Sequence, residues 1–443
     1  MIDFIQYIAF ISAGVFRQVT SSMEEFSAFF PMIMIIESPL ILMMIFGIFR
    51  WYFKNTRRIT VPHTPPITFV ITCYGEGEGI RVTIDSLVEQ IYPGQIEVLA
   101  VVDGAVQNSD TFQAAMKAYR FYQGKKPNRQ VKVIPKWQRG GRVSTLNMGL
   151  HKASHDIVIN VDGDTSFDNN MALVMANQFK DPNVIASGGA LRVRNVDTNI
   201  LTRMQALEYM MSMQGGKTGT SEFGLLNNIS GAFGAFRRPI LKRVGGWDTH
   251  TAEDLDLTMR LKQYKGRYKN YKLAFTPHAI GHTDAPASIK DFALQRLRWD
   301  GDLLFLYLRK HIKGLTPKLL GWPVFLYTLV YGVLKNVLIP ILVVWYFVYL
   351  IIVNPLITSM VSIFLIYLFY LTIIWVKFTI YWLLISERKS DDFLLIGWLF
   401  LYPNYALFAR FVTAFSVFNE VFRRSHEESG MAPWWVLKRG KKF

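Results

Sequence analysis

Hydrophobic and polar residues divide the 443-residue chain into three parts of different character. Residues 31–49, 320–350 and 356–385 are apolar runs long enough to cross a hydrocarbon layer of ~30 Å. Between Val61 and Ile312 the apolar runs are short and alternate with amphipathic segments. This pattern predicts an α/β domain inserted between membrane-spanning helices.

The central part contains three β-branched runs that are typical of strands buried on both faces of a sheet: Ile67–Thr72, Ile96–Val102 and Asp156–Asp162. The helical stretches Gly79–Gln90 and Thr111–Tyr122 separate them. Strands that alternate with helices predict right-handed βαβ units and a mostly parallel sheet. Ligands bind at the carboxyl ends of such strands, so the side chains at these ends are the first candidates for a functional site.

Three features of the apolar segments qualify the membrane prediction. Met1–Thr20 is amphipathic and fits either an interfacial helix or a poor membrane span. Glu37 interrupts the first apolar run, and a carboxylate there either packs against partner helices or is functional. The run Phe393–Phe418 is broken by Pro403 and Arg410, which favours a re-entrant or pore-lining segment over a clean span.

Basic residues outnumber acidic ones and give a formal net charge of +16. Much of the excess flanks the apolar runs, at Lys54, Arg57, Arg58, Lys438, Arg439, Lys441 and Lys442. Cytoplasmic loops of membrane proteins carry such clusters. We therefore expect a multi-pass protein of the cell inner (plasma) membrane, in contact with the lipid bilayer and with its α/β domain in the cytoplasm. No nucleic-acid-binding motif is found in the sequence, and we expect no nucleic-acid partner.

Composition argues against two simpler classes of protein. Hydrophobic residues make up 51% of the chain, a high fraction for a soluble enzyme, whereas the 19% of charged residues is high for a pure transporter. The single cysteine, Cys73, cannot form an internal disulfide. Its apolar surroundings favour a small buried hydrophobic side chain.

The strongest chemical signal is Asp162-Gly163-Asp164, at the end of the third predicted strand. Two carboxylates separated by a residue that allows close backbone approach suit a divalent cation with oxygen ligands, Mg²⁺ or Mn²⁺. Such a cation could bind a diphosphate and neutralise the charge that accumulates on a departing nucleotide. The alternative is an Asp-rich turn that caps a strand.

The other two strand ends also carry acidic side chains. Tyr74 and Glu76 follow the first strand, and Asp103-Gly104 ends the second. Asp103 could accept hydrogen bonds from a nucleobase or ribose, while Tyr74 could stack on a base and Glu76 accept from its edge. Glycine-rich turns would give the same residue pattern without a ligand.

A fourth acidic motif, Glu253-Asp254, precedes the helical pattern Leu255–Lys262. A carboxylate at a helix start is stabilised by the helix dipole, so capping by Asp254 is one interpretation. The other is general-base catalysis, in which the carboxylate removes the proton of an attacking hydroxyl. Both interpretations can hold together.

An amphipathic helical stretch, Gln295–Trp299, leads into the membrane region. Arg298 can pair with phosphate oxygens, and Trp299 can offer its indole face to a sugar ring. Arginine and tryptophan also anchor many helices at membrane interfaces, and the local pattern alone favours this second interpretation.

Taken in order, these motifs resemble those of the processive family 2 glycosyltransferases, which include cellulose, hyaluronan and poly-N-acetylglucosamine synthases. The matching residues span about 67–300 and are Tyr74, Glu76, Asp103-Gly104, Asp162-Gly163-Asp164, Ser230-Gly231, Phe236-Arg237, Gly245-Gly246-Trp247, Glu253-Asp254 and Gln295–Trp299. The resemblance implies a GT-A glycosyltransferase fold, a UDP-sugar donor (UDP-N-acetylglucosamine or UDP-glucose) and inversion at the anomeric carbon.

The resemblance also implies a role for each motif. Asp254 would be the catalytic base, with Glu253 supporting the acceptor site. The donor-binding residues would be Tyr74, Glu76, Asp103, Arg142, Asp162 and Asp164, the last two holding the metal ion. The residues at the acceptor or emerging polymer would be Gln295, Arg298, Trp299, Ser230 and Gly231.

Three positions depart from the family pattern. Gly75 stands where asparagine is usual, and Arg142 stands where lysine is usual. Arginine keeps the positive charge but binds oxygens in a planar fork, which alters the expected phosphate contact. Ala252 replaces the usual threonine before Glu253 and leaves the base in place. These changes leave the sugar unidentified.

The expected organisation has five parts. These are residues 1–58 (an interfacial helix and a membrane helix), 59–287 (the cytoplasmic GT-A domain), 288–318 (interfacial helices), 319–420 (membrane helices and a re-entrant segment) and 421–443 (a basic cytoplasmic tail). We expect a synthase that extends a β-linked polysaccharide and passes it through its own channel. The alternatives are a non-processive transferase acting on a lipid acceptor and a scaffold with a degenerate transferase domain. An accessory membrane or export subunit is left open.

Overall fold

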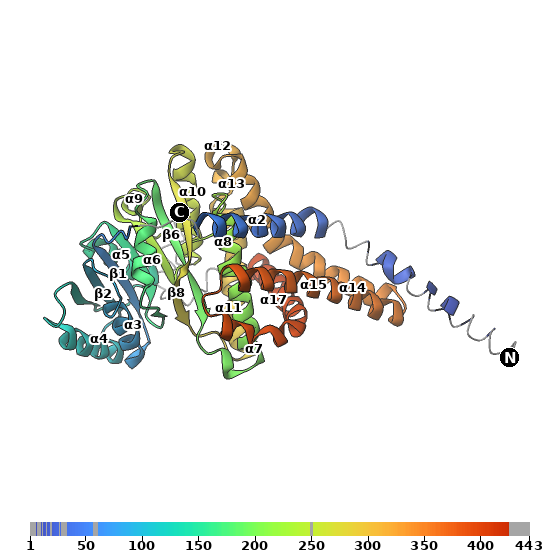
Figure 1. Ribbon diagram of the computed structural model, residues 1–443, viewed down its shortest axis with the longest axis horizontal. Helices are drawn as coiled ribbons and strands as arrows, with labels where there is room; N and C mark the ends of the chain where they lie inside the picture. Colours follow the sequence, from blue (N-terminus) through green and yellow to red (C-terminus); the bar gives the residue numbers. More distant parts are fainter. Residues whose placement is uncertain are drawn as a thin grey trace.

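The computed structural model describes residues 33–55, 61–248 and 251–424, together with scattered positions between 6 and 27. Arg57, Arg58 and the basic tail after residue 424 lie outside the described residues, as does much of Met1–Thr20. Figure 1 shows a sheet domain at one end of the long axis, from which long helices extend towards the other end.

In the described part of the chain, eight strands form one sheet with the order β3-β2-β1-β4-β7-β6-β8-β5. The strands are β1 (Ile67–Cys73), β2 (Ile96–Asp103), β3 (Arg129–Lys136), β4 (Ile157–Asp162), β5 (Ser166–Phe167), β6 (Val184–Val193), β7 (Phe233–Arg237) and β8 (Lys272–Thr283). Strand β1 pairs in parallel with both β2 and β4, whereas β7 runs antiparallel between β4 and β6. The sheet is therefore mixed, with a parallel half of the kind that the sequence predicts.

The three predicted strands correspond to β1, β2 and β4, whose side chains are almost entirely buried. Strand β3 is not predicted by the hydrophobic pattern. It lies at the edge of the sheet and is only half-buried, so its sequence RQVKVIPK interleaves polar and apolar residues. Pro135 is tolerated there because an edge strand leaves one side of its backbone unpaired.

Short helices connect these strands and cover the sheet. Those of the domain are α3 (Ile80–Val88), α4 (Ser109–Tyr122), α5 (Arg142–Lys152), α6 (Met171–Gln178), α7 (Ile200–Glu208), α8 (Lys217–Ser221), α9 (Arg238–Arg243) and α10 (Glu253–Arg267). A π-helical segment, η4 (Tyr209–Gly216), joins α7 to α8.

The helices outside the domain begin with η1 (Ile33–Glu37) and α2 (Ser38–Asn55) on its N-terminal side. On the C-terminal side lie α11 (Ile289–Phe305), η5 (Leu306–Lys310), η6 (Ile312–Gly314), α12 (Pro317–Leu320), α13 (Trp322–Tyr327), η7 (Thr328–Leu338), α14 (Ile339–Val353), α15 (Leu356–Leu384), α16 (Lys389–Phe393), η8 (Ile396–Leu401) and α17 (Tyr402–Arg423).

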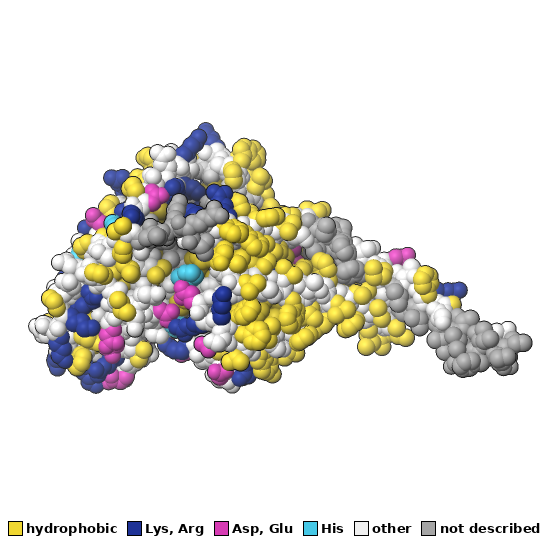
Figure 2. All heavy atoms as spheres, in the orientation of Figure 1, with side chains coloured by type: hydrophobic (Ala, Val, Ile, Leu, Met, Phe, Trp, Pro, Cys, Tyr) yellow, Lys and Arg dark blue, Asp and Glu magenta, His cyan; other side chains and the backbone are white. Residues whose placement is uncertain are grey.

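Among the described residues, three helical stretches are long and apolar enough to cross a membrane: Ile35–Asn55, Trp322–Val353 and Leu356–Leu384. They coincide with the three apolar runs of the sequence. Large apolar side chains such as Ile352 and Leu356 are more than two-thirds exposed, and Figure 2 shows hydrophobic side chains gathered over this helical half. An exposed apolar surface of this extent indicates contact with lipid.

Glu37, the acidic residue in the first apolar run, packs against partner helices. Its carboxylate forms an ion pair with Arg410 of α17 and accepts a hydrogen bond of 2.6 Å from the Tyr370 hydroxyl of α15. Pro403 lies in the first turn of α17, where its missing N–H has no helical partner to lose. Of the two residues that interrupt the run Phe393–Phe418, Pro403 therefore begins a helix and Arg410 pairs with a buried carboxylate.

The helix α2 contacts the domain through a glycine pair. A Cβ atom built at Gly47 of α2 would overlap the carbonyl of Gly219 in α8, and one at Gly219 would overlap the carbonyl of Met44. Only glycine at both positions allows the two backbones to approach this closely.

We expect Gly219→Ala to separate α2 from α8 and lower the stability of the protein by about 1–3 kcal/mol, the usual cost of overpacking. The measurement is thermal unfolding of detergent-solubilised protein. Gly397→Ala is the matched control, because nothing lies within 4 Å of the added methyl group. Equal melting temperatures for the two variants would contradict the close packing.

Candidate functional site

The carboxyl ends of β1, β2 and β4 bring the predicted strand-end residues to one edge of the sheet. Thr72 of β1 pairs with Asp162 of β4. The residues that follow Thr72 and Asp162 are therefore close in space, although they are about 90 positions apart in the sequence. The parallel sheet thus assembles three of the acidic motifs at one place.

Arg142, the first residue of α5, joins these motifs. One terminal nitrogen lies 2.6 Å from Asp162 Oδ1, and its Nε donates to Glu253 Oε1 at 2.6 Å. The other terminal nitrogen donates to the Gly231 carbonyl at 2.7 Å. Burial alone would lower the pKa of Arg142, but the two carboxylates overcome this effect and raise it. The arginine thereby links the motifs predicted to hold the metal, to face the acceptor and to supply the catalytic base.

Asp254 faces the same space from the start of α10. Its Oδ2 accepts hydrogen bonds from the Asn228 side chain at 2.9 Å and from the Gly231 amide at 3.2 Å. Its Oδ1 accepts from the Leu255 amide at 2.7 Å. One oxygen therefore meets a backbone donor at the helix start, while the other points towards the Ser230-Gly231 loop. The N-cap of α10 is Ala252 and no side chain caps this helix, so the capping interpretation of Asp254 is wrong, while its role as a base stays a prediction.

The start of α10 is strained and firmly anchored. Ala252 has φ = 44°, a left-handed conformation that costs a non-glycine residue about 1–2 kcal/mol. Two residues after Asp254, the fully buried carboxylate of Asp256 lies 2.8 Å from both His311 and Lys310 and 2.7 Å from Arg260.

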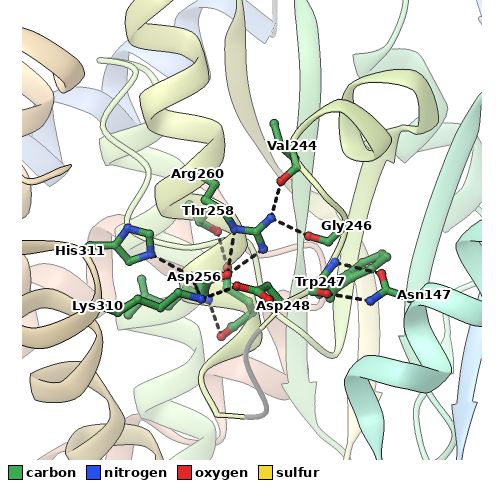
Figure 3. A network of polar contacts seen from close by, with 12 residues as sticks. Asn147, Val244, Gly246, Trp247, Asp248, Asp256, Thr258, Arg260, Lys310 and His311 are labelled. Carbon is green, nitrogen blue, oxygen red and sulfur yellow. Dashed lines mark hydrogen bonds and ion pairs between the residues drawn. The ribbon is translucent and has the colours of Figure 1, made fainter. Parts of the chain in front are cut away.

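Figure 3 shows how Asp256 and Arg260 extend this network to the loop that precedes α10. Arg260 donates to the carbonyls of Val244 and Gly246, at 2.6 and 2.8 Å. Burial would raise the pKa of Asp256, but His311 and the neighbouring cations lower it well below its ordinary value. The sequence interpretation did not include this network, because its members are scattered over three segments.

Asp103 is placed at the end of β2, but its carboxylate is occupied by the protein. Oδ1 accepts from Lys136 Nζ at 2.5 Å and from the Gly140 amide at 2.9 Å, and Oδ2 accepts from the Gly141 amide at 2.8 Å. Gly141 has φ = 82°, which glycine adopts readily. In the structure Asp103 therefore holds the loop that orients Arg142.

Tyr74 and Glu76 follow β1 on the rim of this edge. Tyr74 is 45% exposed, and the Arg139 guanidinium lies 4.1 Å from the centre of its ring. Glu76 packs against the backbone of Gly163, where an added Cβ would lie 2.8 Å from its carboxyl carbon. Tyr74 and Arg139 together offer a flat cationic and aromatic surface.

The carboxylates around Gly163 fit a divalent cation. Glu76 has a buried Oε2 without a hydrogen-bond partner, and Asp164 is exposed. Burial raises the pKa of both Glu76 and Asp164, and the negative charges of neighbouring carboxylates act in the same direction. The described residues contain no group of three His, Cys, Asp or Glu that would hold a metal alone. Mg²⁺ is usually bound by one or two carboxylates together with substrate phosphates, which matches this set.

The motif Gln295–Trp299 lies on α11. Gln295 is half-buried, with its Oε1 lacking a hydrogen-bond partner, while Arg298 and Trp299 are exposed. The buried residue of the motif is Arg296, which was not singled out from the sequence. It lies 2.6 Å from Glu208 of α7 and 5.2 Å from the centre of the Trp299 ring.

Glu208 also accepts a hydrogen bond of 2.5 Å from the Tyr405 hydroxyl of α17. The signal that could have identified Arg296 is its spacing of four from Phe292, which places both side chains on the buried face of α11. This face holds the motif between the domain and α17.

A cavity of about 240 Å³ begins beside the catalytic motif and continues between the apolar helices. Asn228, the hydrogen-bond partner of Asp254, lies in its wall. Its other lining residues are Leu40, Ile41, Met44, Glu208, Ser212, Gly216, Lys217, Thr220, Asn227, Tyr327, Tyr331, Lys335, Asn336 and Lys377. The cavity thus lies between the loop of Asn227 and Asn228 and the helices α2, α13, η7 and α15.

Comparison with known proteins agrees with this geometry. The sequence model of the family described as "Glycosyltransferase like family 2" matches residues 65–301. A poly-beta-1,6-N-acetyl-D-glucosamine synthase of Staphylococcus epidermidis is 26% identical over 384 residues, which cover 84% of this chain and 87% of that protein. A synthase of the same name from Staphylococcus aureus is 29% identical over 252 residues, covering 56% and 57%.

Among solved structures, a mannosyltransferase from Pyrobaculum calidifontis in complex with GDP-Man and Mn²⁺ superposes with a TM-score of 0.53. The two chains are 17% identical, and the match covers 92% of this chain and 99% of the other. This similarity confirms the predicted GT-A fold.

The residue after Trp299 provides a test of how α11 is buried. Burial raises the pKa of Asp300 to about 6, although Arg296 and a 2.6 Å hydrogen bond from Thr413 act in the opposite direction. Between about pH 4 and pH 6 the folded protein then binds more protons than the unfolded chain, so stability falls as the pH rises through this window. Above it the ionised carboxylate costs up to about 3 kcal/mol.

We expect Asp300→Asn to remove this cost, so that the variant gains stability over the parent protein at pH 8 but not at pH 4. The measurement is chemical unfolding in detergent across this pH range. The exposed Asp110→Asn is the control and should change neither value. A difference between variant and parent that is independent of pH would rule out the raised pKa.

Proposed function

The chain belongs to the family 2 glycosyltransferases, and from this premise we propose that it transfers a sugar from a UDP-sugar to the end of a growing β-linked polysaccharide. The main observation in support of this proposal is the cavity beside Asp254, because a polymerising enzyme needs a path for its product as well as an active site. The two relatives named as poly-beta-1,6-N-acetyl-D-glucosamine synthases support a polysaccharide product and UDP-N-acetylglucosamine as donor, ahead of UDP-glucose.

The donor would bind across the carboxyl edge of β1, β2 and β4. Tyr74 and Arg139 would stack against the uracil, and Asp103 would keep the loop before Arg142 in place. Asp162 and Asp164 would hold Mg²⁺ or Mn²⁺, with Glu76 close by. The bound cation would supply positive charge that offsets the diphosphate as it leaves.

The acceptor hydroxyl would lie between Asp254 and the donor. Asp254 would remove its proton as the oxygen attacks the anomeric carbon from the face opposite UDP, which inverts the configuration at that carbon. Asn228 and the Gly231 amide keep the carboxylate oriented, and Arg142 holds Glu253 away from it.

The polymer would leave through the cavity between α2, η7 and α15. Ser230, Gly231 and Gln295 would face the acceptor end, and Arg298 and Trp299 would lie between the nucleotide and the emerging chain. Lys54 at the end of α2 supports a cytoplasmic position of the domain at the cell inner (plasma) membrane, on the side where nucleotide-sugars are made.

We expect Asp254→Asn to lower the transfer rate by about 10²–10⁴, the usual contribution of a general base, while donor binding changes little. The measurement pairs UDP release with UDP binding by calorimetry in purified membrane protein. The exposed Asp291→Asn on α11 is the matched control. Transfer at the parent rate by the Asp254 variant would refute the assignment of the base.

A further inference from the structure

The cavity that leaves the catalytic site is lined by three lysines from different elements. Lys217 belongs to α8, Lys335 to η7 and Lys377 to α15. All three are half-buried, and within the described part of the chain none forms an ion pair with a carboxylate. Lys335 is held instead 4.7 Å from the centre of the Tyr331 ring.

Two of the carboxylates near these lysines are already neutralised by other residues, whereas Asp254, which acts on Lys217, is hydrogen-bonded only to amide groups and offsets one of the three charges. Glu208, which lines the same cavity, is paired with Arg296 at 2.6 Å. Glu37 is paired with Arg410. The three ammonium groups therefore leave an excess of positive charge along the cavity.

An excess of this kind is costly in a membrane protein. An ammonium group at the centre of a bilayer costs about 2.5–3.5 kcal/mol on insertion scales, and such residues usually mark a substrate path. Burial lowers the pKa of Lys217, which lies outside the membrane helices, to about 8, even though Asp254 acts in the opposite direction. A ligand with negative groups would offset these costs.

The remaining wall is suited to a glycan. The rings of Tyr327 and Tyr331 are stacked, with centres 5.2 Å apart, and offer flat faces to sugar rings. The amides of Asn227, Asn228 and Asn336 supply hydrogen-bond donors and acceptors. Among the lining residues, the large aliphatic side chains all come from α2. The apolar surface that they provide is too small for a long lipid tail.

We propose that the acceptor chain in this cavity carries carboxylate groups, so that the product is an acidic polysaccharide containing uronic acids or similarly carboxylated sugars. The inference rests on the proposed function and specifies the class of acceptor. Ammonium groups on three different elements of the wall fit a chain with repeated charges better than a single phosphate. UDP-N-acetylglucosamine remains compatible as a donor, because acidic sugars can alternate with N-acetylglucosamine.

The test uses the full chain in nanodiscs of phosphatidylcholine, which has no net charge. One probe is a hexasaccharide of alternating glucuronic acid and N-acetylglucosamine, and the other is the same oligomer with its carboxylates reduced to alcohols. We expect the acidic probe to bind about tenfold more tightly or better, a preference that weakens as salt is added. The double variant Lys335→Gln/Lys377→Gln should bind both probes equally.

Two further variants keep the test independent of folding. Lys335→Arg/Lys377→Arg should retain the preference, because the charge is kept. Lys313→Gln removes an exposed lysine outside the cavity and should also retain it. Equal binding of the two probes by the parent protein, or a preference that survives in the double glutamine variant, would overturn the proposal.

Two additional measurements separate this inference from its alternatives. The first measures the binding of undecaprenyl phosphate to the parent protein and to the lysine variants. If this lipid binds through the same lysines and the acidic glycan is not displaced by it, the cavity belongs to a lipid carrier and the proposal is overturned. UDP release from UDP-sugars is followed in the same nanodiscs. Turnover without acidic preference would reject the acidic acceptor alone, whereas absence of turnover with every UDP-sugar would reject the proposed function.

Discussion

The guanidinium of Arg142 is the interaction on which the arrangement of the catalytic edge depends. It contacts Asp162 from the sheet, Gly231 from the Ser230-Gly231 loop and Glu253 from α10, three segments that no other described contact joins at one point. Removing one partner from such a buried ion pair typically costs about 3–5 kcal/mol, because a charge is left uncompensated. The guanidinium presents five N–H donors in fixed directions within one plane, which suits three partners that lie around it.

Buried ion pairs perform the same task at the boundary with the membrane helices. Arg192 of β6 forms two hydrogen bonds, of 3.0 and 2.9 Å, with Asp392 of α16. Arg296 and Glu208 join α11 to α7. These pairs fix the catalytic domain on the helices, so that the cavity opens beside Asp254. The lysines of that cavity stand apart, because their charges have no such partner.

Much of the fold followed from the sequence, since continuous β-branched runs and long apolar segments are produced by burial alone. The position of the strand-end carboxylates followed as well, because parallel strands end at one edge. Other contacts could not be predicted. The partners of Asp256 and the occupied state of Asp103 depend on side chains from distant segments, such as His311 and Lys136. The edge strand β3 was missed because half-burial leaves no distinctive pattern.

Synthesis in oriented proteoliposomes tests most directly whether catalysis and export occur in one chain. Purified protein would be reconstituted with its catalytic domain facing outwards and supplied with radiolabelled UDP-N-acetylglucosamine, alone and with UDP-glucuronic acid. We expect a long labelled polymer inside the vesicles, protected from added glycosidase until detergent is present. A labelled lipid carrying one sugar, or a polymer that is digested without detergent, would contradict it.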